Sequence, residues 1–278
     1  MPLSQIAILS ILEGLTEFLP LPSDALHRLL SEICGIGKPD VKLSVAMQAG
    51  ALAAVICYYL ADLVKITYYV FVAVVRRMQG PVARIGICLL IAGIPSFITI
   101  LMVHQPLVDD QSITMISCWA CIACGLLLAV STFVNRHLIW QKVPKIEGER
   151  KDTLRHMNWQ QALIVGIAQV FMAIPGMSRA AITLSAGLFL GLRSEAAARL
   201  SFLLAIPVIV ASISMDVVRM QGIGGTTGLC WNDLLIGATS SFVSSIVAIH
   251  FFLRYLVKSG LKVFAISFVL FGGLTVKF

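Results

Sequence analysis

Long apolar stretches alternate with short polar segments along most of the chain, and their lengths predict helices that cross a membrane. An α-helix needs about 20 predominantly apolar residues to span the hydrocarbon core of a bilayer. Six stretches approach or exceed this length: residues 43–60, 84–103, 113–134, 196–215, 234–254 and 261–277. We therefore expect about six transmembrane helices of this kind.

Two further pairs of apolar stretches are too short or too broken to cross on their own. The first pair is interrupted by Pro20 and Pro22, and the second by Pro175 and Gly176. Broken backbone at membrane depth is tolerated only where protein buries it or where it lines a wet cavity. Each pair therefore predicts a re-entrant helical hairpin. The pairs are residues 4–19 with 25–34, and residues 160–174 with 180–192.

The same order of elements, a hairpin followed by three spans, occurs twice along the chain. Residues 1–134 and 158–278 hold the two copies, and residues 135–157 form a basic loop between them. Both hairpin breaks also share the pattern P-x-x-S-[D/R]-A. Because three spans are an odd number, the second copy is expected to be inverted, so that the hairpin tips meet near the midplane. Transporters built from inverted repeats place their binding sites there.

Composition and charge agree with a membrane protein. The chain is 58% hydrophobic and only 13% charged, whereas soluble domains have about 25% charged residues, so a water-soluble globule is excluded. The net charge of +7 is concentrated in residues 62–84, 135–157 and 254–262, while residues 104–112 and 216–233 are poor in basic side chains. The positive-inside rule places the basic segments in the cytoplasm and both termini outside. This accounts for the charge without a nucleic-acid partner and predicts an all-α polytopic membrane protein.

Glu13 and Glu17 are the first candidates for chemistry. They are four residues apart and therefore share one face of a helix. Carboxylates inside an apolar helix are costly, by about 2.5–3.5 kcal/mol each on insertion scales. The pair therefore predicts either a site for a divalent cation, Mg²⁺ or Ca²⁺, or a general acid/base pair. The alternative is that both side chains reach the membrane interface near the N-terminus.

Ser178 and Arg179 follow the second break and precede an apolar helix. An arginine beside the backbone N–H groups of a helix N-terminus favours anion binding, and its planar fork suits phosphate. Thr183 lies four residues later and is expected on the same face. A buried Arg179 paired with Asp24 or a glutamate is the alternative, and such a partner is compatible with holding Arg179 until substrate arrives.

Ser23 occupies the equivalent place after the first break. Its hydroxyl is either exposed in the cavity as a nucleophile or positioner of water, or it caps the following helix. His27 lies four residues further on. If the segment is helical, His27 and Ser23 are neighbours, and His27 is a candidate base or proton relay. The alternative places His27 at the headgroup boundary.

Two of these segments carry a resemblance to a known family, the undecaprenyl-diphosphate phosphatases or bacitracin-resistance membrane proteins. Glu13-Gly-Leu-Thr-Glu17-Phe-Leu-Pro20 resembles that family's EGxTEFLP segment, and Pro175-Gly-Met-Ser178-Arg179-Ala-Ala-Ile-Thr183 resembles its PGxSRSxxT motif. The resemblance runs over nearly the whole chain in the right order. Lesser matches are Gln48-Ala-Gly50-Ala, Gly93-Ile-Pro95 and Ser201-Phe-Leu-Leu-Ala205-Ile-Pro207.

The resemblance implies the same two-hairpin fold in a bacterial inner (plasma) membrane, with a site open to the periplasm. It implies hydrolysis of undecaprenyl diphosphate to the monophosphate carrier used in peptidoglycan synthesis, and with it roles in cell shape and bacitracin resistance. The polyprenyl tail would lie in the bilayer between spans, and a homodimer is left open. Carried over residue by residue, the catalytic set is Glu13, Glu17, Ser23, His27 and Arg179, the substrate-binding set is Ser178, Arg179, Thr183 and Gln48, and the cation ligands are Glu13 and Glu17.

The first motif departs from the family pattern. After Pro20 the family usually reads V-S-S-T-G-H, whereas this chain reads Leu21-Pro22-Ser23-Asp24-Ala25-Leu26, with the histidine one position later. The serine that follows the arginine in the second motif is Ala180 here. The phosphate-binding half is thus better preserved than the half with the nucleophile and base. A non-hydrolytic polyprenyl-phosphate transporter of the same fold is the second hypothesis, and an ion-coupled transporter the third.

Overall fold

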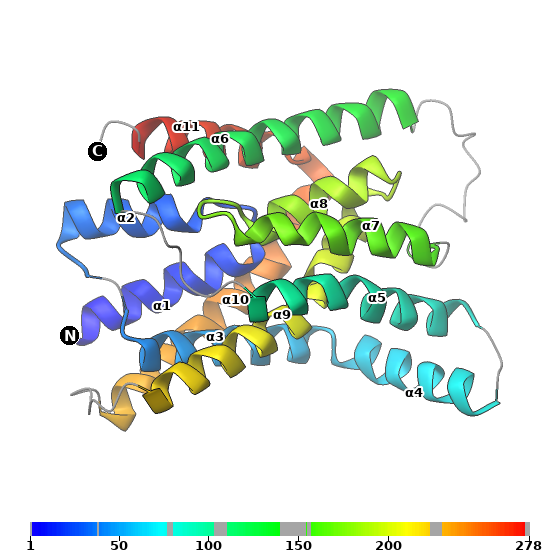
Figure 1. Ribbon diagram of the computed structural model, residues 1–278, viewed down its shortest axis with the longest axis horizontal. Coiled ribbons are helices and arrows are strands. Elements are labelled where there is room, and N and C mark those ends of the chain that lie inside the picture. Colours follow the sequence, from blue (N-terminus) through cyan, green and yellow to red (C-terminus); the bar gives the residue numbers. More distant parts are fainter. Residues whose placement is uncertain are drawn as a thin grey trace.

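The computed structural model describes residues 2–37, 39–76, 80–102, 110–139, 154, 157–222 and 230–275. These residues form helices and contain no strand (Figure 1). Five helices are long and apolar enough to cross a bilayer, which confirms an all-α multi-pass membrane protein. They are α3 (Val41–Tyr58), α5 (Pro81–Met102), α6 (Asp110–Val134), α9 (Ser194–Gly222) and α10 (Trp231–Ser259).

The sixth predicted span is shorter than expected. In the described residues it is α11 (Lys262–Thr275), which has 14 residues. At 1.5 Å per residue it is about 21 Å long, less than the ~30 Å hydrocarbon core. Figure 1 shows α11 lying along α6, and α11 ends at the same end of the bundle at which α1 begins.

The two predicted hairpins are present as pairs of short helices. The 16-residue α1 is about 24 Å long, so it cannot cross the bilayer, and both members of the second pair are shorter still. Figure 1 shows the pairs entering from opposite ends of the bundle. The division into two inverted copies stays a prediction. The pairs are α1 (Leu3–Phe18) with α2 (Ser23–Cys34), and α7 (Trp159–Gln169), continued by the 3-10 turn η3 (Val170–Ala173), with α8 (Arg179–Phe189).

One segment predicted as a loop is instead largely helical. The prediction assigned residues 62–84 to a basic loop, but α4 (Leu60–Arg76) occupies most of them and packs against α5. The prediction was wrong because basic residues indicate the side of the membrane and do not exclude a helix. The other basic segment, residues 135–157, begins with the π-helical turn η1 (Asn135–Ile139), and most of the remainder lies outside the described residues.

Small residues let α10 approach α1 and α3 closely. A Cβ atom on Gly14 of α1 would collide with serine side chains of α10, and one on Gly50 of α3 would overlap the carbonyl of Ala238. The Ser245 hydroxyl donates to the Gly14 carbonyl oxygen at 3.2 Å. Helices in a membrane associate through this kind of close packing and interhelical hydrogen bonding, because lipid tails are as apolar as the side chains. The contact holds α1, which carries both candidate glutamates, against the long helices.

The second hairpin turns at a glycine that no other residue replaces without strain. Gly176 has a φ of +87°, in the left-handed region that favours glycine. A Cβ atom there would also overlap the backbone of Ser117 on α6. The Cys121 thiol donates to the Gly176 carbonyl oxygen at 3.3 Å. The turn is therefore pressed against α6, which fixes where Ser178 and Arg179 begin α8.

Candidate functional site

A cavity of about 330 Å³ lies where the two hairpins meet. Six of the eight predicted site residues line it, although the chain distance between the first and second hairpins exceeds a hundred residues. The six are Glu13, Glu17, Ser23, Gln48, Ser178 and Arg179. Thr16, Ser212 and six apolar side chains complete the wall. The apolar ones come from α5, from η3 and the turn after it, and from α8 and α9: Ile100, Met172, Met177, Ala180, Val208 and Ile209.

The two hairpin breaks contact one another reciprocally. Asp24 and Arg179 occupy the same place in the shared P-x-x-S-[D/R]-A pattern, and each reaches across to the opposite hairpin. The Asp24 carboxylate accepts the backbone N–H of Gly176 at 2.6 Å. Arg179 Nη2 donates to the carbonyl oxygen of Glu17 at 2.7 Å. From the sequence, Asp24 was predicted only as a partner for Arg179; the repeated P-x-x-S-[D/R]-A pattern was the signal for this second role.

Arg179 is held rigidly at the centre of the site. Nη2 also donates to Glu17 Oε1 at 3.1 Å, and Nη1 donates to the carbonyl oxygen of Ser201 on α9 at 3.1 Å. Only 10% of the Arg179 side chain is exposed. A guanidinium has five N–H groups, so these three bonds leave donors for a ligand in the cavity that Arg179 lines. Of the two partners considered for Arg179, the structure selects a glutamate, Glu17.

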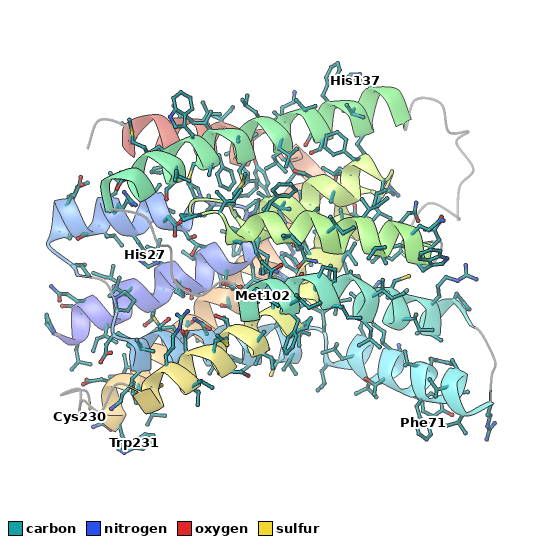
Figure 2. The ribbon with its side chains drawn as sticks, in the orientation of Figure 1. His27, Phe71, Met102, His137, Cys230 and Trp231 are labelled. Carbon is teal, nitrogen blue, oxygen red and sulfur yellow. The ribbon has the colours of Figure 1, made fainter. Side chains whose placement is uncertain are left out.

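Glu13 forms a second pair, with His27. The His27 Nε2 and Glu13 Oε2 atoms are 3.1 Å apart. Helix α2 begins at Ser23, so His27 follows Ser23 by one helical turn, as the helical alternative required. His27 nevertheless faces α1 and does not line the cavity, whereas Glu13 and Ser23 do. Figure 2 shows His27 between the ribbons of α1 and α2. Of this pair, Glu13 therefore faces the cavity and His27 lies behind it.

Ser178 and Thr183 build the N-terminal end of α8. The Ser178 side chain caps the helix by accepting the Ala181 N–H at 3.4 Å. Thr183 is fully buried and does not line the cavity. Its hydroxyl donates to the Arg179 carbonyl oxygen at 2.9 Å and lies 2.6 Å from the Ser201 hydroxyl. Thr183 thus links α8 to α9 through Ser201, the residue whose carbonyl oxygen accepts the hydrogen bond from Arg179 Nη1.

Gln48 enters the cavity from α3 and contacts a carboxylate that the sequence analysis missed. Its Nε2 atom donates to Ser44 Oγ at 3.2 Å and to Asp216 Oδ2 at 3.3 Å. Asp216 had been assigned to the loop after a span ending at residue 215, but α9 continues to Gly222. The spacing of Ser212 and Asp216, four residues apart on one helix, was the available signal.

Two carboxylates face the cavity as candidate cation ligands. No group of three His, Cys, Asp or Glu side chains suited to a metal occurs among the described residues. Mg²⁺ is commonly held by one or two carboxylates together with substrate phosphates and water. One oxygen of Glu13 and one of Glu17 already contact His27 and Arg179. The pair therefore fits a cation that is shared with substrate oxygens, and does not fit an all-protein cage.

Residues 6–274 match a family described as bacitracin resistance protein BacA. The chain belongs to this family. Among similar proteins, undecaprenyl-diphosphatase 2 of Stutzerimonas stutzeri is 33% identical over 272 residues, covering 98% of this chain and 96% of that protein. Undecaprenyl-diphosphatase 1 of Pseudoalteromonas translucida is 34% identical, with 98% and 97% covered. Undecaprenyl-diphosphatase of Marinobacter nauticus is 32% identical, again with 98% and 97% covered. Membership of the BacA family confirms the resemblance carried by the two motifs.

Proposed function

We propose that this BacA-family protein is an undecaprenyl-diphosphatase, which converts undecaprenyl diphosphate to the monophosphate carrier for cell-wall synthesis. Its similarity over almost the whole length to proteins of that name supports the activity. The observation that carries the proposal is the cavity in which Arg179, Glu13, Glu17 and Ser23 face one space at the junction of the hairpins. A guanidinium group beside a pair of carboxylates is suited to binding and cleaving a diphosphate.

Hydrolysis at this site would proceed by attack of an oxygen nucleophile on the terminal phosphorus. The nucleophile is the Ser23 hydroxyl or a water molecule placed by it, and the P–O bond of the anhydride breaks as undecaprenyl monophosphate leaves. If Ser23 attacks, a second attack by water releases phosphate from the serine. Arg179 stabilises charge on the transferring group. Glu13 lines the cavity and takes the nucleophile's proton, with His27 as its hydrogen-bonding partner.

The remaining residues position this machinery. Ser178 and Thr183 fix the start of α8, and Gln48, whose amide donates to Asp216, lines the cavity on the α3 side. As the alternative to proton transfer by Glu13, Glu13 and Glu17 would together hold Mg²⁺ or Ca²⁺ through their remaining carboxylate oxygens. Such an ion, when bound, neutralises the charge of the diphosphate oxygens. The polyprenyl tail would lie among the helices in the bilayer.

Phosphate release tests the proposed function. Purified protein is incubated with a C55 diphosphate, with and without added divalent cation, and released phosphate is measured. We expect hydrolysis. Binding of the lipid without release under any cation condition would instead favour the non-hydrolytic polyprenyl-phosphate transporter.

Ser23 and His27 are expected to matter unequally. Ser23→Ala should lower kcat at least ~10²-fold, since it removes the nucleophile or its positioner. His27→Ala should lower kcat by about 10-fold, because it removes only the partner of Glu13. Lipid binding should survive both changes. Ser31→Ala, at an exposed position of the same helix, is the control for α2. Unchanged turnover in Ser23→Ala would exclude the serine and point to water alone.

The orientation in the membrane has a separate test. The basic segments place residues 135–157 in the cytoplasm and residues 104–112 outside, and we propose that the cavity opens to the periplasm of a bacterial inner membrane. Single cysteines in a cysteine-free background should react with an impermeant thiol reagent in intact cells at residues 104–112 and stay unlabelled at residues 135–157. Labelling of the second segment from outside would reverse the orientation.

A further inference from the structure

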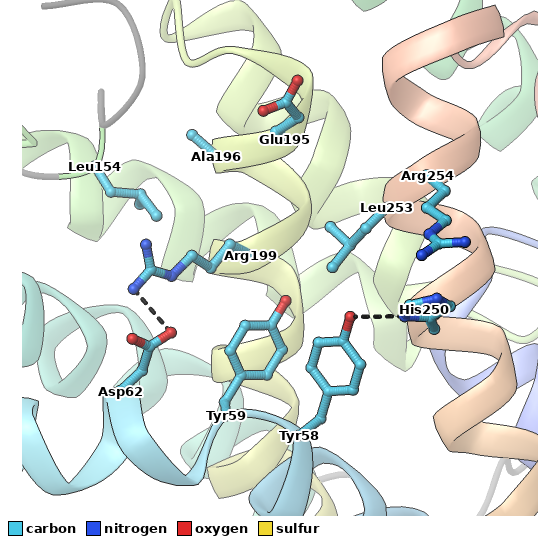
Figure 3. A pocket seen from close by; sticks show the side chains of 10 residues that line it. All are labelled: Tyr58, Tyr59, Asp62, Leu154, Glu195, Ala196, Arg199, His250, Leu253 and Arg254. Atoms are coloured by element: carbon cyan, nitrogen blue, oxygen red, sulfur yellow. Dashed lines mark hydrogen bonds and ion pairs between the residues drawn. The ribbon is translucent and has the colours of Figure 1, made fainter.

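A second cavity, of about 510 Å³, lies away from the hairpin junction. It is formed where α3 ends, α4 and α9 begin, and α10 approaches its C-terminal end (Figure 3). Helix α9 contributes to both cavities, through Arg199 here and Val208 at the first. Nine residues of α-helix separate the two by about 14 Å.

Buried aromatic rings separate the two cavities. The Phe202 ring on α9 contacts Phe18, the residue after Glu17, with ring centroids 5.7 Å apart. The centroid of the Phe202 ring also lies 6.3 Å from that of the Tyr59 ring. Phe18 and Phe202 are essentially inaccessible to solvent. The second cavity is therefore a distinct site and not an extension of the first.

Tyr59 supplies the observation that calls for a ligand. Its side chain is 6% exposed, and its hydroxyl has no hydrogen-bond partner among the described residues. Figure 3 shows this hydroxyl directed into the cavity, toward the space between Arg199 and Leu253. A buried donor without a partner is unfavourable, so an acceptor in the cavity would stabilise the structure.

The charged groups around Tyr59 indicate the sign of that acceptor. Arg199 is already paired with Asp62 at 2.9 Å, and Tyr58 Oη lies 3.4 Å from His250 Nδ1. Arg254 extends beside His250 at the same cavity (Figure 3). The other lining carboxylate, Glu195, is exposed at the first turn of α9, and Figure 3 shows it beside Ala196, at the top of the view. Guanidinium, imidazole and phenol side chains thus line one cavity, and of its two lining carboxylates among the described residues Asp62 is paired with Arg199 and Glu195 is exposed.

We propose that this second cavity binds a phosphate monoester or inorganic phosphate, held by Tyr59 and Arg254 with Arg199 and His250 beside them. A phosphate carries several acceptor oxygens and negative charge, which matches a phenol and planar guanidinium forks. Apolar walls from Leu154, Ala196 and Leu253 also suit the first carbons of a lipid chain. The choice of a polyprenyl tail rests on the proposed function, whereas the preference for phosphate does not.

Equilibrium binding to the purified full chain in lipid nanodiscs tests this. The probes are radiolabelled inorganic phosphate and radiolabelled farnesyl monophosphate, neither of which is a diphosphate substrate. Binding is measured in wild-type protein and in Arg179→Ala, in which the first cavity has lost its phosphate ligand. Tyr59→Phe removes only the unpartnered hydroxyl, and Arg254→Gln removes one exposed charge. Tyr255→Phe is the matched control, since Tyr255 packs on Phe264 and does not line the cavity.

We expect at least one probe to bind Arg179→Ala. Adding Tyr59→Phe or Arg254→Gln to this variant should weaken the binding about tenfold or more, and adding Tyr255→Phe should leave it unchanged. Binding of phosphate alone identifies the free ion as the ligand, and binding of farnesyl monophosphate alone identifies a lipid headgroup. The proposal is overturned if neither probe binds to wild type or to Arg179→Ala. It is overturned equally if a probe binds and Tyr59→Phe leaves that binding unchanged. Hydrolysis of the C55 diphosphate is assayed in parallel, and its absence in wild type would count against the proposed function and not against this site.

Discussion

Replacing Arg179 by alanine is expected to lower hydrolysis of undecaprenyl diphosphate by at least ~10²-fold, the loss typical of removing one preorganised donor to a developing oxyanion. Among the described residues that line the first cavity, Arg179 is the one with a guanidinium group. Arg179→Lys keeps the charge but cannot reproduce the fork that contacts Glu17 and Ser201 together, so substantial impairment is expected there too. Initial rates of phosphate release across substrate concentrations measure both effects.

Folding must be checked in the same variants. Arg179 holds α8 to α1 and α9, and its removal leaves Glu17 without its partner, so a lowered thermal midpoint is expected alongside the lost activity. Arg84→Ala changes an exposed arginine on α5 and is the control for loss of positive charge. A folded Arg179→Lys protein with wild-type turnover would remove Arg179 from the phosphate-binding role.

Glu13 and Glu17 are expected to act as a unit. Each change to glutamine should raise the concentration of divalent cation needed for half-maximal activity, because each removes one charged oxygen ligand. The double variant should lose less than the product of the two single losses, since the second change removes a ligand from a site already broken. Rates measured across a titration of Mg²⁺ and of Ca²⁺ in the four proteins give both results.

Glu32→Gln, an exposed glutamate on α2, controls for a general loss of negative charge. If the activity losses of the two single variants multiply in the double variant, and the cation concentration needed is unchanged, Glu13 and Glu17 do not share an ion. They would then have separate roles, as the proton acceptor and as the support of Arg179. The contacts of Glu13 with His27 and of Glu17 with Arg179 define those roles.

Features set by neighbouring residues could be predicted from the sequence. Long apolar stretches become the long helices, because an uninterrupted apolar segment in a bilayer satisfies its backbone only as a helix. Pro20 and Pro175 follow the ends of α1 and η3, and Pro22 precedes α2, since proline cannot donate its N–H and restricts the residue before it. Pro95 and Pro207 instead lie within the long helices α5 and α9. The two hairpins were therefore predictable, and so was the common face of Glu13 and Glu17. Helix α4 was missed because its basic residues were interpreted only as a sign of a cytoplasmic loop.

What only the tertiary structure decided is the choice of partners among groups far apart in the chain. The sequence alone determined that Ser23 and His27 lie one turn apart if helical, that Arg179 begins a helix and that each break exposes polar groups. It did not determine that His27 turns to Glu13, that Glu17 and not Asp24 receives Arg179, or that Gln48 meets Asp216. Helical periodicity depends on adjacent residues, whereas these pairings depend on how α1, α2, α3, α8 and α9 pack. Small residues contribute to that packing: Gly14 lets α1 lie close to α10, and Gly176 lets the second hairpin lie close to α6.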